Sequence, residues 1–258
     1  MIAGFSFEDI LHEALVAPRS ALVPLPDTQI LERPGLWQMI TPSLTRGGMN
    51  EVVCTELPED TADQAIDEAI EPYRRLDLRF RWTVRPDSKP ADLAERLARR
   101  GLLRSESLVM ARATAGAPSE YGESVTVEEV DLAGVDELTR VMAEGWQVDP
   151  GPLGELHRRM LAAPAGRNRF FLARDEGTAA AVASYMAADR SAYLVGAVAL
   201  PAHRGRGLYR ALVHARLRDA ESRGLKLATT VAKADTSAPI LARLGFETVC
   251  TVPTYVNF

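Results

Sequence analysis

The sequence predicts a mixed α/β protein of the α+β kind, built from two successive units. Segments that alternate apolar and polar residues, as half-buried strands do, recur between segments with helical spacing along the whole chain. With 258 residues, the chain reaches the size at which one core tends to become two. Residues 113–124 are small, polar and turn-forming, which is typical of a surface connection. We therefore expect one unit over residues 1–121 and another over residues 122–258.

The first unit is expected to combine strands with amphipathic helices. Ile66, Ile70 and Tyr73 recur at helical spacing, whereas Phe80 and Trp82 belong to a strictly alternating segment. Acidic residues in the first 18 positions suit the first turns of a helix. The expected strands cover residues 50–56, 78–84 and 103–112, and the expected helices cover residues 61–76 and 88–101.

The second unit is expected to begin with a strand and two helices, followed by a hairpin. A continuous apolar run over residues 193–200 then leads directly into a glycine-rich loop, and the next helix ends at Gly224. A shorter helix ends at Gly245. The expected strands cover residues 125–130, 169–174, 179–186, 193–200, 225–231 and 247–256, and the expected helices cover residues 132–142, 154–162, 208–223 and 237–244.

The two units share a weak internal similarity. Residues 83–102 and 230–246 both read as the end of a strand, a helix containing Leu-Ala or Ile-Leu-Ala, and a glycine after that helix. The spacing differs between the two copies, so the pattern fits either a degenerate duplication or a chance similarity of two such segments.

Composition excludes several classes of function. The formal net charge is −5 and basic residues are mixed with acids, so we expect neither a nucleic-acid partner nor a membrane-surface helix. Cys54 and Cys250 are too few and too isolated for a disulfide framework, and the four histidines have no ligand partner at helical spacing, so no metal is expected. The first residues lack a basic signal region and no segment is apolar enough to span a membrane, which predicts a cytoplasmic protein.

The segment 203–210, His-Arg-Gly-Arg-Gly-Leu-Tyr-Arg, has the properties of a phosphate-binding loop. It lies where the first amides of a helix have no internal partner, and glycines let the backbone approach an anion closely. The loop lacks the lysine and hydroxyl residue of nucleoside-triphosphate loops and the third glycine of dinucleotide folds, and it follows a late strand. A solvated basic turn at a helix start is the alternative.

These residues resemble the acetyl-CoA loop of the GNAT superfamily of N-acetyltransferases, over residues 198–212, and the segment ending in Leu244-Gly245-Phe246 resembles the next helix of that family. The resemblance implies a sheet splayed at its centre, with the pantetheine arm along one strand and the pyrophosphate on loop amides. Tyr209 departs from the pattern, because the family usually has Gly or Ala there. The implied cofactor-binding residues are Ala197, Val198, Ala199, Arg204, Gly205, Arg206, Gly207, Leu208, Tyr209 and Arg210.

The first half resembles the degenerate half of tandem acetyltransferases. Acidic residues at 56–60 stand where its own glycine loop would be, and they would repel pyrophosphate. The resemblance therefore implies a support domain that does not bind the cofactor and that walls the acceptor pocket.

The family's usual acid and base residues are missing, because Thr229, Ala234 and Leu241 occupy their positions. Tyr255 is one substitute, as an acid for the leaving thiolate, although a packing role fits it better. Glu144, two residues before Trp146, is a second candidate, either as the base or as an anchor for a cationic substrate. The alternative is that Glu144 belongs to a solvated loop.

We expect an acyl-CoA-dependent N-acyltransferase, with acetyl-CoA as the donor, that acts on a small amine or a peptide amine by direct transfer. Because the usual acid and base are missing, a non-catalytic acyl-CoA-binding regulatory module is the alternative. A transferase that uses another carrier, such as aminoacyl-tRNA, is disfavoured by the absence of a basic face. The acceptor, the acyl chain and the oligomeric state are not encoded in any recognisable motif.

Overall fold

The structure is a computed structural model that describes residues 2–46, 48–53, 55–118 and 124–257. The chain forms two compact units, which confirms the predicted mixed α/β class. Unit 1 consists of Met1–Val23 and Val109–Cys250, and unit 2 consists of Pro24–Leu108 and Thr251–Phe258. The chain thus passes between the units three times, whereas a single boundary was expected between residues 121 and 122. That expected boundary lies outside the described residues.

Unit 1 is built on a seven-stranded mixed sheet with the order β12-β6-β11-β10-β9-β8-β7. The Phe-Phe-Leu-Ala stretch of β8 and the alanine-rich stretch of β9 are buried on both faces, which explains why helices cover both. Its strands are β6 (Ser107–Ala113), β7 (Val125–Val130), β8 (Asn168–Asp175), β9 (Thr178–Ala187), β10 (Ser191–Ala199), β11 (Leu227–Lys233) and β12 (Glu247–Thr251). Its helices are α1 (Phe7–Leu15), η1 (Ala17–Ala21), α4 (Val135–Trp146), α5 (Pro150–Ala162), η2 (Pro201–His203), α6 (Leu208–Ser222) and α7 (Ser237–Arg243).

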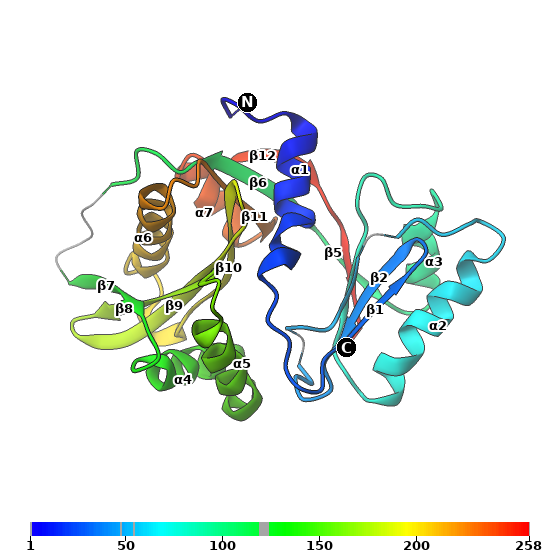
Figure 1. Cartoon of the computed structure of the whole chain (residues 1–258), viewed down its shortest axis with the longest axis horizontal. Coiled ribbons are helices and arrows are strands. Elements are labelled where there is room, and N and C mark those ends of the chain that lie inside the picture. The colour runs from blue at the N-terminus through cyan, green and yellow to red at the C-terminus, as the bar shows by residue number, and fades with distance from the viewer. Residues whose placement is uncertain (1, 47, 54, 119–123, 258) are drawn as a thin grey trace. The chain divides into compact units, whose positions relative to one another are not determined.

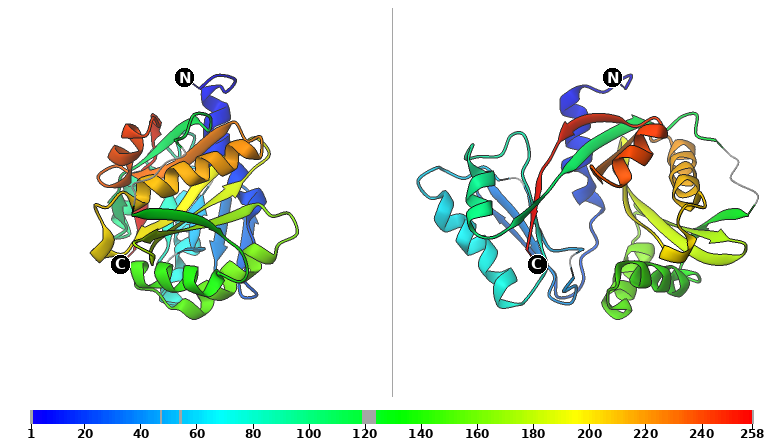
Figure 2. Two further views of the ribbon diagram at one scale, coloured as in Figure 1. Left: turned by 90° about the vertical axis from the view of Figure 1, so that its left-hand side faces the viewer. Right: turned by 180° about the vertical axis from the view of Figure 1, so that it is seen from behind.

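Two layers of helices enclose this sheet. Helix α6 lies along one face, and α4 and α5 lie on the other, where they pack on Phe170, Leu172 and Val182 (Figure 1). The second views of the ribbon show the same sandwich from the side and from behind (Figure 2). Helix α1 packs against β10 and β11, and Ile10 lies in a cluster with Leu227 of β11. The first helix of the chain is therefore part of unit 1.

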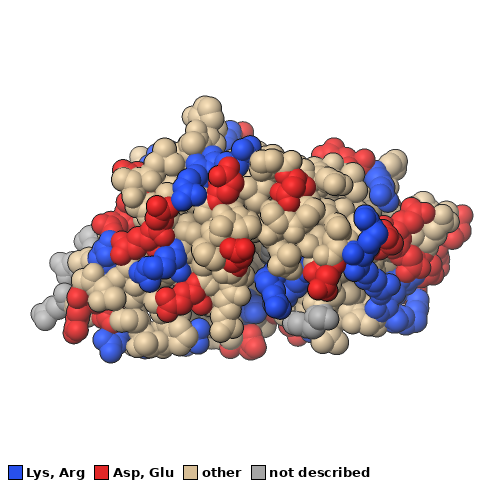
Figure 3. All heavy atoms as spheres, turned by 90° about the horizontal axis from the view of Figure 1, so that it is seen from below, with Lys and Arg blue, Asp and Glu red and all other residues tan. Residues whose placement is uncertain are grey.

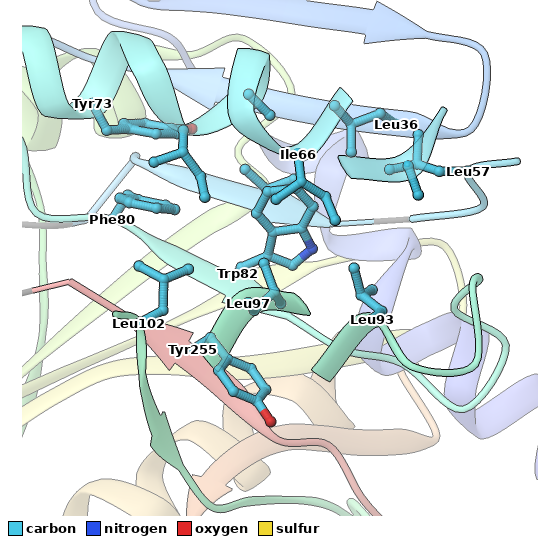
Figure 4. Close-up of a cluster of buried hydrophobic side chains, with 14 of the residues drawn as sticks. Leu36, Leu57, Ile66, Tyr73, Phe80, Trp82, Leu93, Leu97, Leu102 and Tyr255 are labelled. Atoms are coloured by element: carbon cyan, nitrogen blue, oxygen red, sulfur yellow. The ribbon is translucent and has the colours of Figure 1, made fainter. Parts of the chain in front are cut away.

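Unit 2 contains a six-stranded sheet with the order β1-β2-β3-β4-β13-β5. Its elements are β1 (Gln29–Arg33), β2 (Leu36–Ile40), β3 (Glu51–Val53), α2 (Ala62–Arg75), β4 (Arg81–Thr83), α3 (Leu93–Arg99), β5 (Leu103–Ser105) and β13 (Thr254–Val256). Ile66, Tyr73, Phe80 and Trp82 form the centre of its core (Figure 4). The periodic residues that predicted α2 and β4 are thus the ones that this unit buries.

Two predicted strands are each divided between the sheets. The strand expected over residues 103–112 is β5 in the sheet of unit 2 followed by β6 in the sheet of unit 1. The last expected strand is likewise β12, beside β6, followed by β13, between β4 and β5. The backbone amide of Val252 donates to the Ser107 carbonyl at 2.8 Å, so the two divided strands are hydrogen-bonded to each other where they change sheets.

The hairpin of β1 and β2 was not predicted, because β1 is exposed and carries no clear apolar period. Among the described residues, no helix is long and apolar enough to cross a membrane. Cys54 lies outside the described residues, whereas Cys250 is a half-buried free thiol whose pKa is raised by burial.

Candidate functional site

The sheet of unit 1 opens between β10 and β11. These parallel strands pair only over Ser191–Tyr193 and 227–229, although both strands continue further. One residue beyond the last pair, the Thr230 hydroxyl donates to the Leu194 carbonyl at 2.8 Å. After that point β10 stays paired with β9 alone, so its other edge turns toward the opening. The sheet is therefore splayed as the resemblance implied.

A β-bulge shapes the free part of β10. The pairing of β10 with β9 shifts between Val195 and Val198, and Gly196 has a φ of +66°. Such a left-handed conformation favours glycine and turns the strand locally. The predicted pantetheine residues, Ala197, Val198 and Ala199, follow this bulge and are half-buried. They form an accessible strand edge at the splay.

The loop after β10 leads to an open helix start. Gly205 and Gly207 have φ values of +80° and +84°, and α6 begins at Leu208. No described side chain caps this helix, so the amides of its first turn have no intrahelical or side-chain partner. A Cβ atom added at Gly205 would meet nothing within 4 Å. The loop therefore exposes amides and the positive end of a helix dipole to an incoming anion.

The basic side chains of the loop have different roles. His203 Nδ1 and Arg206 Nη1 lie 2.7 and 2.8 Å from the same oxygen of Asp175. Arg204 Nε donates to the Ala199 carbonyl at 3.3 Å, while Arg210 is exposed on the first turn of α6. Arg204 and Arg210 thus carry charge beside the loop amides without an ion pair to Asp175.

Asp175 anchors the loop to the turn between β8 and β9. It is 2% exposed, and the hydrogen bond from His203, ahead of the charge of Arg206, holds the pKa of its carboxyl below the usual value. In the sequence, Asp175 lies between the two expected strands of the hairpin, over residues 169–174 and 179–186, and no motif links it with the loop. The two segments meet only because β9 and β10 bring them together.

Tyr209 is accommodated by a buried arginine. Tyr209 interacts with Arg216, two turns further along α6, and burial raises the pKa of its hydroxyl. Burial also lowers the pKa of Arg216 to about 10, and the Nη1 atom of Arg216 donates to the Ser184 carbonyl of β9 at 3.0 Å. The tyrosine side chain is thus directed along α6 toward a residue that faces the sheet, away from the start of the helix. Its backbone amide remains in the first turn.

The predicted substitute acid, Tyr255, belongs to the core of unit 2. It lies on β13, is 4% exposed and packs beside Leu97 and Leu102, with its hydroxyl directed away from the cluster (Figure 4). This environment favours the packing role. Of the family positions that lack the usual acid and base, Thr229 and Leu241 are buried in unit 1 and Ala234 is half-buried.

A cavity of about 600 Å³ lies between α4 and α5, and Glu144 is one of its lining residues. Glu144 pairs with Arg140 at 3.5 Å on the exposed face of α4. Asp149, after Trp146, accepts a hydrogen bond from the Gly151 amide and caps α5. Of Glu144 and Asp149, Glu144 is therefore the acid that a substrate could pair with without uncapping a helix.

A metal site has no support in the described part of the chain, where no three His, Cys, Asp or Glu residues are grouped to hold an ion. The splayed part of β10, the glycine loop and the open start of α6 follow one another directly along the chain, beginning at the central strand of the sheet. Together they can bind an extended ligand that ends in a phosphate.

Comparisons with known proteins agree with this geometry. Residues 134–246 match the model of the acetyltransferase (GNAT) family. A GCN5-related N-acetyltransferase from Kribbella flavida is similar in structure, with a TM-score of 0.66, 20% identity, and coverage of 94% of this chain and 96% of that one. A search of curated proteins found no match.

Two further solved structures are similar over both units. A GCN5-related N-acetyltransferase from Sphaerobacter thermophilus gives a TM-score of 0.64 at 15% identity, over 86% of this chain and 76% of that one. A tandem GNAT protein from the clavulanic acid biosynthesis pathway gives a TM-score of 0.58 at 16% identity, over 93% of this chain and 87% of that one. Residues 134–246 are therefore a GNAT acetyltransferase domain, and the chain as a whole has a fold found in tandem GNAT proteins.

Proposed function

We propose that unit 1 binds acyl-CoA, in the simplest case acetyl-CoA, and transfers the acyl group directly to a small amine or a peptide amine. The observation that carries this proposal is the half-buried edge of β10, which leaves β11 at the splay and leads to the open start of α6. An extended arm with amide groups fits a strand edge, and a pyrophosphate fits a helix start. The cytoplasmic location expected from the sequence belongs to the same proposal.

In this proposal, each part of the segment 197–210 has a distinct task. The backbone of Ala197, Val198 and Ala199 pairs with the pantetheine arm. The amides of Gly205, Arg206, Gly207, Leu208, Tyr209 and Arg210 hold the pyrophosphate, and Arg204 adds charge beside them. When bound, acyl-CoA supplies a thioester carbonyl that an amine can attack. Unit 2 supports the fold, and we assign it no cofactor site.

The acceptor in this proposal is a basic amine. Glu144 borders the cavity between α4 and α5. In this proposal its carboxylate leaves the ion pair with Arg140 and pairs with the ammonium group of the substrate. An acylated RNA carrier is disfavoured, because Lys and Arg are interspersed with Asp and Glu across the face shown in Figure 3. The net charge of −5 also disfavours an RNA carrier as the donor.

Calorimetry with acetyl-CoA and CoA tests the cofactor site. Gly207→Glu places a carboxylate where the pyrophosphate should lie, and we expect Kd to rise about a hundredfold, ~2.7 kcal/mol. Gly224→Glu is the matched control, since Gly224 has a φ of +78° with nothing within 4 Å of its added Cβ, at the far end of the same helix. No binding by the wild type, or equal Kd values for the two variants, would contradict the site.

A thiol-release assay with a panel of amines tests the reaction. Free CoA that appears only when both acetyl-CoA and an amine are present supports transfer. Tight binding without turnover over a broad panel would instead identify a non-catalytic acyl-CoA-binding module. The two readouts therefore separate binding from catalysis.

A further inference from the structure

The cavity between α4 and α5 has a balanced set of charges. Its charged lining residues are two acids and two bases, Asp136, Glu144, Arg140 and Arg158. Arg158 Nη2 lies 2.5 Å from Asp136 Oδ1, and Arg140 Nη1 lies 3.5 Å from Glu144 Oε2. Each charge of the cavity therefore has an opposite charge beside it.

Helix α4 crosses the sheet from β8 to β10. In its first turn, Glu137 pairs with Arg174 of β8 at 2.6 Å. In its last turn, a Cβ atom added to Gly145 would lie 2.4 Å from Val198 Cγ2 of β10. The helix thus packs so closely on β10 that this contact leaves no room for a side chain.

The two ion pairs of the cavity follow this direction. Asp136 precedes Glu137 at the β8 end of α4, and Glu144 precedes Gly145 at the β10 end. The two acids are ~12 Å apart along the helix axis. The pair of Arg140 with Glu144 is therefore the one beside the strand on which we place the pantetheine arm. A substrate amine held by Glu144 lies at the end of the cavity that is nearest to this strand.

The pair of Arg140 with Glu144 can be exchanged at little cost. Its side chains are 55% and 58% exposed, and exposed ion pairs contribute about 0–1 kcal/mol. An ammonium group that pairs with Glu144 leaves the guanidinium of Arg140 without this carboxylate. A second carboxylate, on the same ligand, restores the balance, because a guanidinium binds a carboxylate through two parallel hydrogen bonds. The cavity therefore suits a zwitterion better than a simple amine or a simple acid.

The uncharged lining of the cavity offers apolar surface and room. It includes the hydrocarbon side chains of Ala143, Val148 and Pro150, and also Gly151 and Gly154, which have no side chains to fill the space. The cavity volume of about 600 Å³ lies within the range of about 300–1,000 Å³ that is usual for small-molecule pockets. A ligand of this cavity can therefore carry an apolar side chain besides its charged groups.

We propose that this cavity binds a zwitterionic amino acid with an apolar side chain as the acceptor. This inference rests on the proposed transferase function and names its substrate class. The ammonium group pairs with Glu144, the carboxylate pairs with Arg140, and the side chain lies against Ala143 and Val148.

The transfer to such an acceptor is balanced in atoms and protons. The ammonium group loses one proton to water, and the neutral nitrogen forms a bond to the thioester carbonyl carbon. The carbon–sulfur bond breaks, and a second proton of the amine passes to the CoA thiolate. The products are an N-acyl amino acid and free CoA.

Calorimetry at low ionic strength, on protein saturated with CoA, tests this assignment with three probes. Leucine carries both charged groups, 3-methylbutylamine lacks only the carboxylate, and 4-methylpentanoate lacks only the amine. We expect leucine to bind at least about tenfold more tightly than either analogue, since each lost charge-assisted contact costs about that much. No binding of leucine, or a Kd within about threefold of that of 3-methylbutylamine, would overturn the inference.

Variants of the ion pair assign each charged group of the ligand. Arg140→Gln should weaken leucine at least about tenfold without weakening 3-methylbutylamine, which has no carboxylate. Glu144→Gln should weaken leucine and 3-methylbutylamine, but not 4-methylpentanoate. Arg159→Gln is the matched control, because Arg159 pairs with Glu155 one turn earlier on α5 and does not line the cavity. Equal losses for leucine and 3-methylbutylamine in Arg140→Gln would overturn the assignment of the carboxylate.

Thiol release separates this inference from the proposed transfer. With acetyl-CoA, leucine should give a kcat/KM at least about tenfold above that of 3-methylbutylamine, as its tighter binding predicts. Equal release with both compounds would overturn the amino-acid assignment and leave the transfer intact. Leucine that binds and responds to the variants as expected, but releases no thiol, would support the binding site and contradict the transfer.

Discussion

Replacing Gly196 by alanine should destabilise unit 1 at the bulge of β10. Gly196 has a φ of +66°, which costs a residue with a side chain about 1–2 kcal/mol. Its added Cβ would also lie 2.6 Å from the Ser184 hydroxyl oxygen of β9. Overpacking of this kind costs about 1–3 kcal/mol. We therefore expect the free energy of unfolding to fall by about 2–5 kcal/mol.

Urea unfolding of four variants separates the two contributions. Gly224→Ala has the same backbone problem, with a φ of +78°, but nothing within 4 Å of its Cβ, so it should lose only about 1–2 kcal/mol. Ser184→Ala removes a hydrogen bond to the Val195 carbonyl and should cost about 1 kcal/mol. The double variant Ser184→Ala with Gly196→Ala should then be more stable than the sum of the single losses predicts.

Equal losses for Gly196→Ala and Gly224→Ala would refute the steric part of this reasoning. A double-mutant cycle without coupling would refute it independently, because the clash requires the Ser184 oxygen. The Kd of acetyl-CoA gives a second readout, since any shift of the bulge moves Ala197–Ala199 but leaves the loop glycines in place.

Two further outcomes follow from buried groups. Burial lowers the pKa of His157 to about 4, so the folded protein should lose about 3 kcal/mol of stability as pH falls from 6.5 toward 4. Urea unfolding at several pH values should show this loss in the wild type and in a variant of the exposed His12. The loss should be absent from His157→Gln. Asp175→Asn should raise the Kd of acetyl-CoA about tenfold, because His203 and Arg206 lose their shared anchor. Tighter binding by this variant would mean that repulsion of phosphate by the carboxylate outweighs its positioning of the loop.

Most helices and strands could be predicted because their signals are local. The alternation around Trp82 and the helical spacing of Ile66 and Tyr73 depend only on neighbours in the chain, and these side chains form the core of unit 2. The loop glycines could be predicted for the same reason, since their positive φ values meet a local need of the turn into α6.

The partners of the residues around the site could not be predicted in this way. Asp175 reaches His203 across 28 positions, and Glu13 reaches Ser191 across 178. No periodicity links such positions. Tyr255 shows the same limit, because its alternating strand suits either sheet and only the pairing with Trp82 and Arg104 places it in unit 2.

The sequence by itself determined the mixed α/β class, most of the helices and strands, and the resemblance of residues 198–212 to a loop of the GNAT family. Tertiary structure alone decided that β6 leaves the sheet of β5, and that β13 leaves the sheet of β12. It also decided that α1 lies against β10 and β11. The physical reason is that the two-residue period of a strand indicates which of its faces is buried, but not which strand it pairs with. The burial of Glu13 depends in the same way on tertiary packing, because it contacts Ser191, which is 178 positions further along the chain.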